Sequence, residues 1–158
     1  MGDRGVITTH GSRGDQNRIG VYLHWNGAPD QVEGLLCYCY CQGYRRPEDD
    51  CYGWARFCQV AGNYIGGYLS LGVDTLSNLD CDNWDNGTYI IKNWQIVERV
   101  YGHDDSPFIA DEQTLYKFVS RINSTMPQTE RLDDKVIRQK VHEYWESKPN
   151  TIPQRGEL

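Results

Sequence analysis

Long apolar segments are absent from this 158-residue sequence: no hydrophobic run approaches the roughly 20 residues that a membrane-spanning helix requires. The start of the chain also lacks the basic and apolar pattern of a secretory leader. We therefore expect no membrane partner and a location in the cytoplasm. In that compartment the six cysteines are expected as reduced thiols, because disulfides rarely persist there.

Positive charge is scarce as well. Lys and Arg number 16 against 22 Asp and Glu, and the formal net charge is −6. Binding to duplex nucleic acid requires a basic surface, so this composition argues against such a partner. A protein that mimics DNA would need a denser acidic surface than this charge provides. A small phosphate ligand held by a few local Arg residues is compatible with the composition.

The motifs of several enzyme classes are missing. The sequence has no Walker loop, no Gly-x-Gly-x-x-Gly after a strand, no zincin helix and no nucleophile elbow around a Ser. Nucleophilic catalysis could still use Cys51, which opens a predicted helix, with His24 as its base. The adjacent acids Asp49 and Asp50 oppose thiolate formation, which weakens this possibility. Because Cys51 and His24 could still form such a pair, a small cysteine-dependent hydrolase acting on a nucleotide-like substrate is kept as the alternative function.

Metal-binding patterns are incomplete. In the helical segment Cys37-x-Cys-x-Cys41, Cys39 points about 200° away from its neighbours in the triplet, and zinc sites usually need a second pair of ligands. The Asp/Asn-rich segment Asn78–Gly87 lacks the glutamate that closes a calcium loop. Its last residues, Asp85–Gly87, are typical of a hairpin turn. We expect buried thiols, no metal and no cofactor.

Hydrophobic periodicity predicts an α+β fold. The expected sheet is mainly antiparallel, two central helices pack on it, and C-terminal helices serve for packing or oligomerisation. The predicted strands are Arg4–His10, Arg18–Trp25, Tyr68–Val73, Thr88–Ile91 and Trp94–Tyr101. The predicted helices are Asp30–Gln42, Glu48–Tyr64, Asp111–Ile122 and Thr129–Trp145.

The same pattern divides the chain into three parts: an α+β ligand-binding core over 1–103, a helical extension over 104–147 and a flexible tail over 148–158. The last predicted helix carries an apolar stripe. We expect this stripe to pack either on the sheet or against another subunit. Its residues are Leu132, Val136, Val141 and Trp145.

Aromatic, amide and Arg residues form a candidate binding site. Trp25 and Asn26 end a predicted strand beside a helix start, where free N–H groups favour an anion. Trp25 also suits a core position under that helix. The remaining candidates are Tyr52 and Arg56 on a helix, Trp84 and Asn86 in a loop, and Arg99 late in a strand. Such a set, without a nucleophile or an acid–base pair, is typical of a pocket that holds a nucleotide without altering it.

Three blocks of the sequence resemble a known family. They are Val21–Gly27 (VYLHWNG), Cys51–Arg56 (CYGWAR), and Asp85–Gly87 (DNG) with Tyr89–Ile91 (YII). The chain thereby resembles the phage-encoded Thoeris anti-defence proteins of the first type. These proteins are sponges that sequester the cyclic ADP-ribose isomers made by bacterial TIR-domain enzymes, and they do not cleave them.

The resemblance implies a specific set of properties. The chain would bind a cyclic ADP-ribose-type (glyco-cyclic ADP-ribose) signal in the host cytoplasm during infection, and so block TIR-dependent Thoeris immunity. It would form a homo-oligomer, and some members of the family also hold cyclic oligonucleotides. We expect Trp25 to stack on the adenine and Arg56 to contact the phosphates or riboses.

Overall fold

The computed structural model describes residues 2–11, 15, 17–66, 70–103 and 105–158, and confirms the α+β class. Its strands are β1 (Gly5–Thr9), β2 (Ile19–Leu23), β3 (Leu71–Thr75), β4 (Thr88–Lys92), β5 (Gln95–Val100) and β6 (Gln154–Arg155). Its helices are α1 (Pro29–Gln42), α2 (Cys51–Ile65), α3 (Glu112–Thr125) and α4 (Asp134–Glu146), with short 3-10 turns at Leu76–Asn78 and Gln128–Glu130.

The six strands form one mixed sheet in the order β3-β2-β1-β4-β5-β6. The pairs β1–β2, β2–β3 and β4–β5 are antiparallel, whereas β1–β4 and β5–β6 are parallel. Strands β1 and β4 can run parallel because a long connection, containing β2, both central helices and β3, separates them in the sequence. The mainly antiparallel sheet that the sequence predicts is therefore broadly correct.

One end of this sheet positions most of the candidate residues, and we call it the sheet end. It is the end at which β2 and β5 finish and β1 and β4 begin. Tyr22 of β2 pairs with Val6 of β1, and Val6 in turn lies opposite Thr88 of β4. The opposite end carries the β4–β5 hairpin. Its turn is Asn93–Trp94, with φ angles of 50° and 64°, so the predicted strand start at Trp94 is one residue early.

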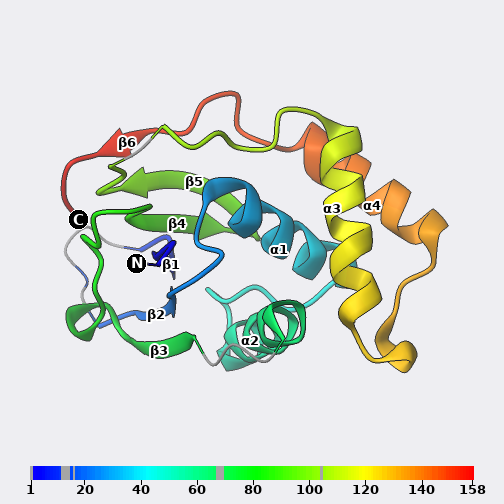
Figure 1. The fold of residues 1–158 in the computed structure, drawn as a ribbon, viewed down its shortest axis with the longest axis horizontal. Coiled ribbons are helices and arrows are strands. Elements are labelled where there is room, and N and C mark those ends of the chain that lie inside the picture. The colour runs from blue at the N-terminus through cyan, green and yellow to red at the C-terminus, as the bar shows by residue number, and fades with distance from the viewer. Residues whose placement is uncertain (1, 12–14, 16, 67–69, 104) are drawn as a thin grey trace.

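Helix α1 lies at the centre of the molecule. Figure 1 shows it between the sheet and α3, with α3 and α4 side by side. Apolar residues of α1 are buried around nearly its whole circumference, which is expected for a helix covered by a sheet on one side and by helices on the other. The sheet contributes Ile7, Val21 and Tyr89, among others, to the same core.

Helix α4 packs inside the chain against α1 and α3. Val141 is buried in this contact, together with Ile137 and Tyr144. Tyr144 also donates its hydroxyl to the backbone oxygen of Trp94 at 2.8 Å, which fixes α4 to the β4–β5 hairpin. Val136, in contrast, stays 37% exposed. Of the predicted stripe, Val141 is buried and Leu132 and Trp145 are partly buried against the same core, so these three residues pack within one chain.

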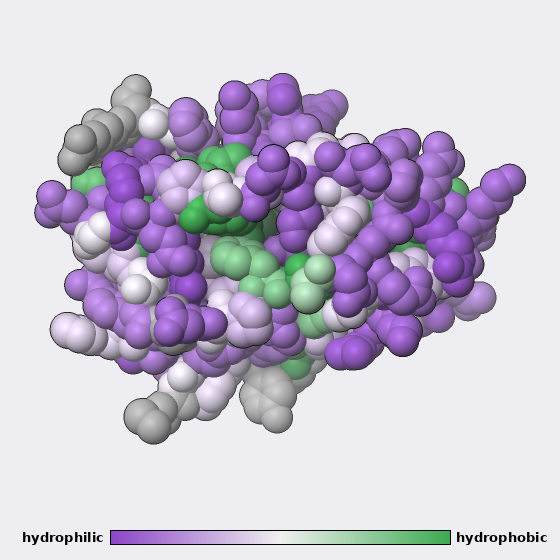
Figure 2. Space-filling view, turned by 90° about the horizontal axis from the view of Figure 1, so that it is seen from above, coloured by the Kyte–Doolittle hydropathy of each residue, from purple (hydrophilic) through white to green (hydrophobic). Residues whose placement is uncertain are grey.

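The last residues of the chain return to the sheet. Gln154 pairs with Arg99 and Arg155 with Val100, which adds the short parallel strand β6 that the sequence does not indicate. Figure 2 shows a face that is mostly hydrophilic, with hydrophobic residues gathered in a small hollow near its middle. Within the part of the chain that the structure describes, no helix is long and apolar enough to span a bilayer.

Candidate functional site

The seven predicted site residues fall in two separate places. Five of them lie at the sheet end, and two lie on the first half of α2. The sheet-end residues are Trp25, Asn26, Trp84, Asn86 and Arg99. The α2 residues are Tyr52 and Arg56.

Asn86 and Arg99 hold the sheet end together from the inside. The Asn86 Nδ2 donates to Asp3 Oδ1 at 2.7 Å and to the Arg4 backbone oxygen at 3.0 Å. Arg99 Nε donates to the Asn86 backbone oxygen at 2.9 Å, and the guanidinium lies 5.5 Å from the centre of the Tyr89 ring. Both Asn86 and Arg99 are fully buried, so in this arrangement they shape the surface from below rather than face a ligand.

Trp25 and Asn26 form the turn that follows β2. Asn26 adopts a left-handed backbone (φ 64°), which Asn tolerates better than most residues, and its Nδ2 donates to Gln31 Oε1 at 3.2 Å. This turn leaves the Trp25 indole 41% exposed, edge-on to the His24 ring at 5.2 Å. The indole therefore does not fill the core under α1 and has a surface free for contact.

Trp84 is presented to solvent by a hydrogen-bonded loop. Buried Asn83 donates to the backbone oxygen of Gly87 at 3.0 Å and accepts from the N–H of the same residue at 3.0 Å, which closes the loop. Trp84 has φ 61° and is 74% exposed, and one face of its indole stacks on His103 at 4.5 Å. His103 Nε2 is in turn hydrogen-bonded to Asp82 Oδ1 at 2.6 Å. The second face of the indole is left open.

This loop is not the hairpin turn that Asp85–Gly87 suggests. Strand β4, which follows the loop, pairs with β1 and β5 and not with the preceding chain. Asp85 instead accepts from Arg4 Nε at 2.7 Å, and this guanidinium holds the pKa of the Asp85 carboxyl below its usual range. Asn-Gly therefore serves here to bring the loop back to the start of β4.

The charge of the sheet end suits a base or a sugar better than a phosphate. Four carboxylates lie at the sheet end: Asp80 and Asp85 contact Arg4, Asp82 contacts His103, and Asp3 contacts Asn86. Strand β1 separates β2 from β4, so the strand ends that carry Trp25 and Trp84 are about 10 Å apart.

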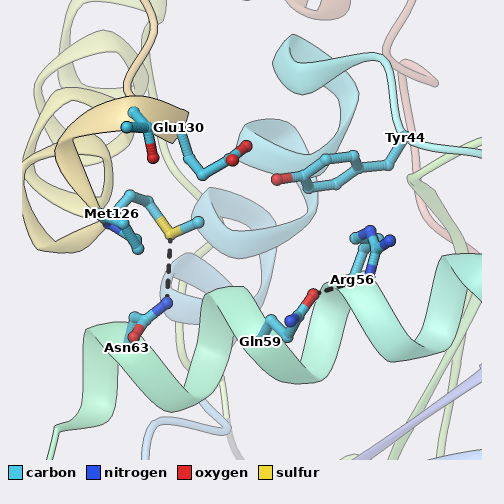
Figure 3. Close-up of a pocket in the computed structure, with 8 residues that line it drawn as sticks. Tyr44, Arg56, Gln59, Asn63, Met126 and Glu130 are labelled. Atoms are coloured by element: carbon cyan, nitrogen blue, oxygen red, sulfur yellow. Dashed lines mark hydrogen bonds between the residues drawn. The ribbon is translucent and has the colours of Figure 1, made fainter.

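The second place is a groove along α2, which we call the α2 groove, with a volume of about 410 Å³. Its lining residues are Tyr44, Arg56, Gln59, Asn63, Met126, Pro127, Thr129 and Glu130. Figure 3 shows Arg56, Gln59 and Asn63 projecting from α2 on one side, with Met126 and Glu130 on the other. The Asn63 Nδ2 lies 3.7 Å from the Met126 sulfur, so the two walls touch at one end.

Local structure explains why α2 offers these side chains. The Asp50 carboxylate caps the helix by accepting the Tyr52 N–H at 2.9 Å, and the apolar face of the helix is buried in the core. The opposite wall is held by Gln42, whose Nε2 donates to the Glu130 backbone oxygen at 2.7 Å. Burial raises the pKa of Tyr44, so its phenol stays protonated to a higher pH than an exposed tyrosine.

Arg56 is the notable charge in this groove. Its Nη1 donates to Gln59 Oε1 at 2.9 Å, and its guanidinium lies 6.0 Å from the centre of the Tyr52 ring, which is itself exposed. Both of these partners are neutral. Among the described residues no carboxylate lies within ion-pair distance of Arg56, so the guanidinium retains its capacity to bind an anion.

The structure does not bring Trp25 and Arg56 together within one chain. Helix α2 starts near the β4–β5 hairpin, where the Asn93 N–H bonds to Glu48 Oε2 at 2.8 Å. Its far end approaches the Trp25 turn, where the Tyr64 hydroxyl donates to Gln31 Oε1 at 3.3 Å. Arg56 precedes Tyr64 by eight residues, or about 12 Å along the helix. The α2 groove and the sheet end are therefore different surfaces.

The same geometry separates Cys51 from His24. Cys51 is the first residue of α2, and α2 spans about 21 Å before it reaches the side of the molecule that holds His24. His24 Nδ1 is hydrogen-bonded to the Tyr22 hydroxyl at 2.9 Å. In this arrangement His24 is not positioned to act as a base for the Cys51 thiol.

The other cysteines are set in the core or partly covered. Cys37, Cys39 and Cys41 are buried in α1, and desolvation raises the pKa values of Cys37 and Cys39 well above the ordinary thiol value. Such thiols stay protonated and unreactive. Among the residues placed in the structure, no group of three or more His, Cys, Asp or Glu side chains is arranged to hold a metal ion.

Sequence reasoning missed the residues that distant segments add to each surface. Arg4 and His103 at the sheet end, and Tyr44 and Glu130 in the α2 groove, come from other parts of the chain. Their local sequence carries no binding motif, and only the packing of α3 and α4 on α1 brings Glu130 opposite Arg56. Comparison with known proteins adds no assignment, because no family model, no curated protein and no solved structure matches this chain.

Proposed function

We propose that this protein binds and sequesters a cyclic ADP-ribose-type nucleotide, such as glyco-cyclic ADP-ribose, without cleaving it. In an infected bacterium this would remove the signal that TIR-domain enzymes produce and block Thoeris immunity. The identity of the ligand is inferred from the sequence resemblance. The observation that carries the proposal is Arg56, a guanidinium without an acidic partner among the described residues, in a groove of nucleotide size.

The chemistry of the α2 groove complements that of the ligand. Cyclic ADP-ribose combines a pyrophosphate, two riboses and an adenine. Arg56 can pair with the pyrophosphate, while the Glu130 carboxylate in the facing wall can accept hydrogen bonds from ribose hydroxyls. The exposed Tyr52 ring lies beside the groove, with the Arg45 guanidinium 5.0 Å and the Arg56 guanidinium 6.0 Å from its centre, so it adds an aromatic surface and a second positive charge near the site. A volume of about 410 Å³ lies within the range of small-molecule sites.

The groove residues suit binding without reaction. None of the eight lining residues is a Cys, a His or a Lys, and Thr129 is the one with an aliphatic hydroxyl. A nucleophile with a base to activate it is what hydrolysis would require. The lining therefore favours a sequestering protein over the cysteine-dependent hydrolase.

Trp25 and Trp84 enter the proposal as a second contact surface. Their exposed indoles at the sheet end can stack on bases, in a region whose acidic surroundings disfavour the phosphates. Ligand binding at this surface is tested separately from binding in the α2 groove, because the two surfaces do not meet within one chain.

Ligand recovery tests the proposed function directly. The protein is incubated with a cyclic ADP-ribose isomer, desalted and heated, and the released compound is identified by mass spectrometry. We expect the intact cyclic nucleotide from the wild type, much less from Arg56→Ala, and wild-type recovery from Lys135→Ala, which removes one exposed positive charge from α4. Release of a cleaved product would overturn the proposal and favour the hydrolase.

A further inference from the structure

The two walls of the α2 groove carry opposite charges. Arg56 projects from α2, and Glu130 lies in the facing wall, as Figure 3 shows. The Arg56 guanidinium donates to Gln59 Oε1 at 2.9 Å on its own helix, and in the described part of the chain it forms no ion pair with Glu130. An open groove between a cation and an anion suits a ligand that is anionic at one end and rich in hydroxyl groups at the other.

The backbone of Glu130 is held by two hydrogen bonds, whereas its carboxylate is available for binding. The Glu130 N–H donates to the Pro127 oxygen at 2.8 Å, and the Glu130 backbone oxygen accepts from Gln42 Nε2 at 2.7 Å. No residue whose position the structure gives donates a hydrogen bond to the Glu130 carboxylate, and the side chain is exposed. Figure 3 shows this side chain extending toward the Tyr44 hydroxyl. Glu130 therefore presents two acceptor oxygens to a ligand in the groove.

Tyr44 lies within range of both charges. Burial is the largest cause of its raised pKa; Cys39 and the Glu130 carboxylate raise this pKa further, whereas the Arg56 guanidinium lowers it. One phenol is thus influenced by a negative charge from one wall and by a positive charge from the other. A ligand in contact with Tyr44 would be subject to the fields of both Glu130 and Arg56.

The lining of the groove has no cation for a further phosphate. Arg56 is the one Arg, Lys or His among the eight lining residues. Arg45, beside the Tyr52 ring, is already paired with Asp50 at 3.1 Å. The pyrophosphate of a cyclic ADP-ribose would use Arg56, so a third phosphate near Glu130 would meet a carboxylate without a counter-charge.

We propose, on the basis of the nucleotide-binding function above, that Glu130 makes the α2 groove selective for ligands whose ribose hydroxyls are free, and rejects ligands that carry an additional ribose phosphate. A carboxylate accepts hydrogen bonds from ribose hydroxyls, as acidic residues do in sites that bind unphosphorylated dinucleotides. A phosphate in the same place would be repelled by the like charge of Glu130. Selectivity would then arise from repulsion of the wrong ligand as well as from attraction of the right one.

Calorimetric titration with cyclic ADP-ribose and with its 2′-phosphate tests this selectivity. The wild type should bind the 2′-phosphate more weakly by about tenfold or more, because like charges repel strongly in a partly covered groove. Glu130→Gln keeps one acceptor oxygen and removes the charge, so the difference between the two compounds should shrink to about threefold or less. The matched control Glu146→Gln removes a carboxylate from α4 that is 68% exposed and outside the groove, and it should keep the wild-type difference.

The outcomes separate the role of Glu130 from the proposed function. Equal binding of the two compounds by the wild type, or a wild-type difference that persists in Glu130→Gln, would disprove the role of Glu130 and leave the proposed function standing. Binding of neither compound by the wild type would overturn the proposed function and the role of Glu130 with it. Thermal melts of both variants should match the wild type, because the contacts that hold Glu130 are made by its backbone.

Discussion

Replacing Lys148 with Met should destabilise the protein in a pH-dependent way. Glu33 lies in the second turn of α1, and its side chain is 2% exposed. Lys148 Nζ lies 2.5 Å from Glu33 Oε1, with 16% of the lysine side chain exposed. Burial raises the pKa of Glu33, and the lysine counteracts that effect. Lys148→Met therefore leaves a nearly buried carboxylate without its counter-ion.

The expected cost follows from this geometry. Breaking a buried ion pair by removing one partner typically costs about 3–5 kcal/mol. Lys148 keeps some contact with water, so we expect the lower end, about 3 kcal/mol at pH 8. That is a large share of the roughly 5–15 kcal/mol that stabilises a typical domain.

The sign of the pH dependence can be worked out from Glu33. Its pKa is raised in the folded state, so the folded chain holds this proton to higher pH than the unfolded chain does. The protonated Glu33 therefore contributes stability that is fully present below its pKa in the unfolded chain and is lost as the pH rises through its pKa in the folded chain. Removal of Lys148 raises that pKa further. The loss in Lys148→Met, relative to wild type, should therefore be smaller at pH 5 than at pH 8.

Urea unfolding followed by tryptophan fluorescence at these two pH values measures the effect. Glu33→Gln combined with Lys148→Met should recover much of the stability at pH 8, because no charge is then buried. Lys135→Met, on the exposed side of α4, is the matched control and should change stability little. A loss below about 0.5 kcal/mol in Lys148→Met at pH 8, or an equal loss at both pH values, would refute the reasoning.

Three further predictions address the candidate site and the thiols. Arg56→Ala should weaken binding of a cyclic ADP-ribose isomer more than tenfold in calorimetric titration, because a charge-assisted hydrogen bond contributes about 1.5–3 kcal/mol. Unchanged affinity with an intact fold would remove Arg56 from the site. Trp25→Ala should weaken the binding free energy by about 1–3 kcal/mol, while Trp25→Phe should retain most of the binding free energy. Thermal melts of both variants should stay near wild type because the indole is partly exposed. A large drop in melting temperature with unchanged affinity would contradict the stacking role. Thiol titration should find six reactive groups in denaturant, with Cys51 reacting first in the folded protein, and stoichiometric zinc in the purified protein would contradict the prediction of no metal.

Periodicity in the sequence predicts much of the element order. The long helices stand out because each has a local signal: Pro29 at the first position of α1 and Gly43 after its end, or Asp111 at the start of α3. Strand β6 has no such signal, since two residues cannot show alternation. Its pairing with β5 depends on where the segment that follows α4 is directed by the packing of that helix.

The candidate site divides in the same way between sequence and packing. Residue type and local position are enough to indicate Trp25, Trp84 and Arg56, because an indole beside a turn and an Arg on the polar face of a helix are visible in the sequence. Burial is not visible there. Asn86 and Arg99 have the side-chain chemistry of binding residues, yet both are buried. Arg99 donates to the Asn86 backbone oxygen, and the Asn86 side chain donates to Asp3.

The sequence by itself determined the α+β class, the four helices and the residue types available for binding, because these depend on local periodicity and on side-chain chemistry. The tertiary structure decided which of those residues reach the surface and which meet. The parallel pairing of β1 with β4 places Trp25 and Trp84 at one end of the sheet, whereas the packing of α3 and α4 on α1 sets Glu130 across from Arg56. These contacts join residues far apart in the chain, so their energy arises only once the whole core is formed.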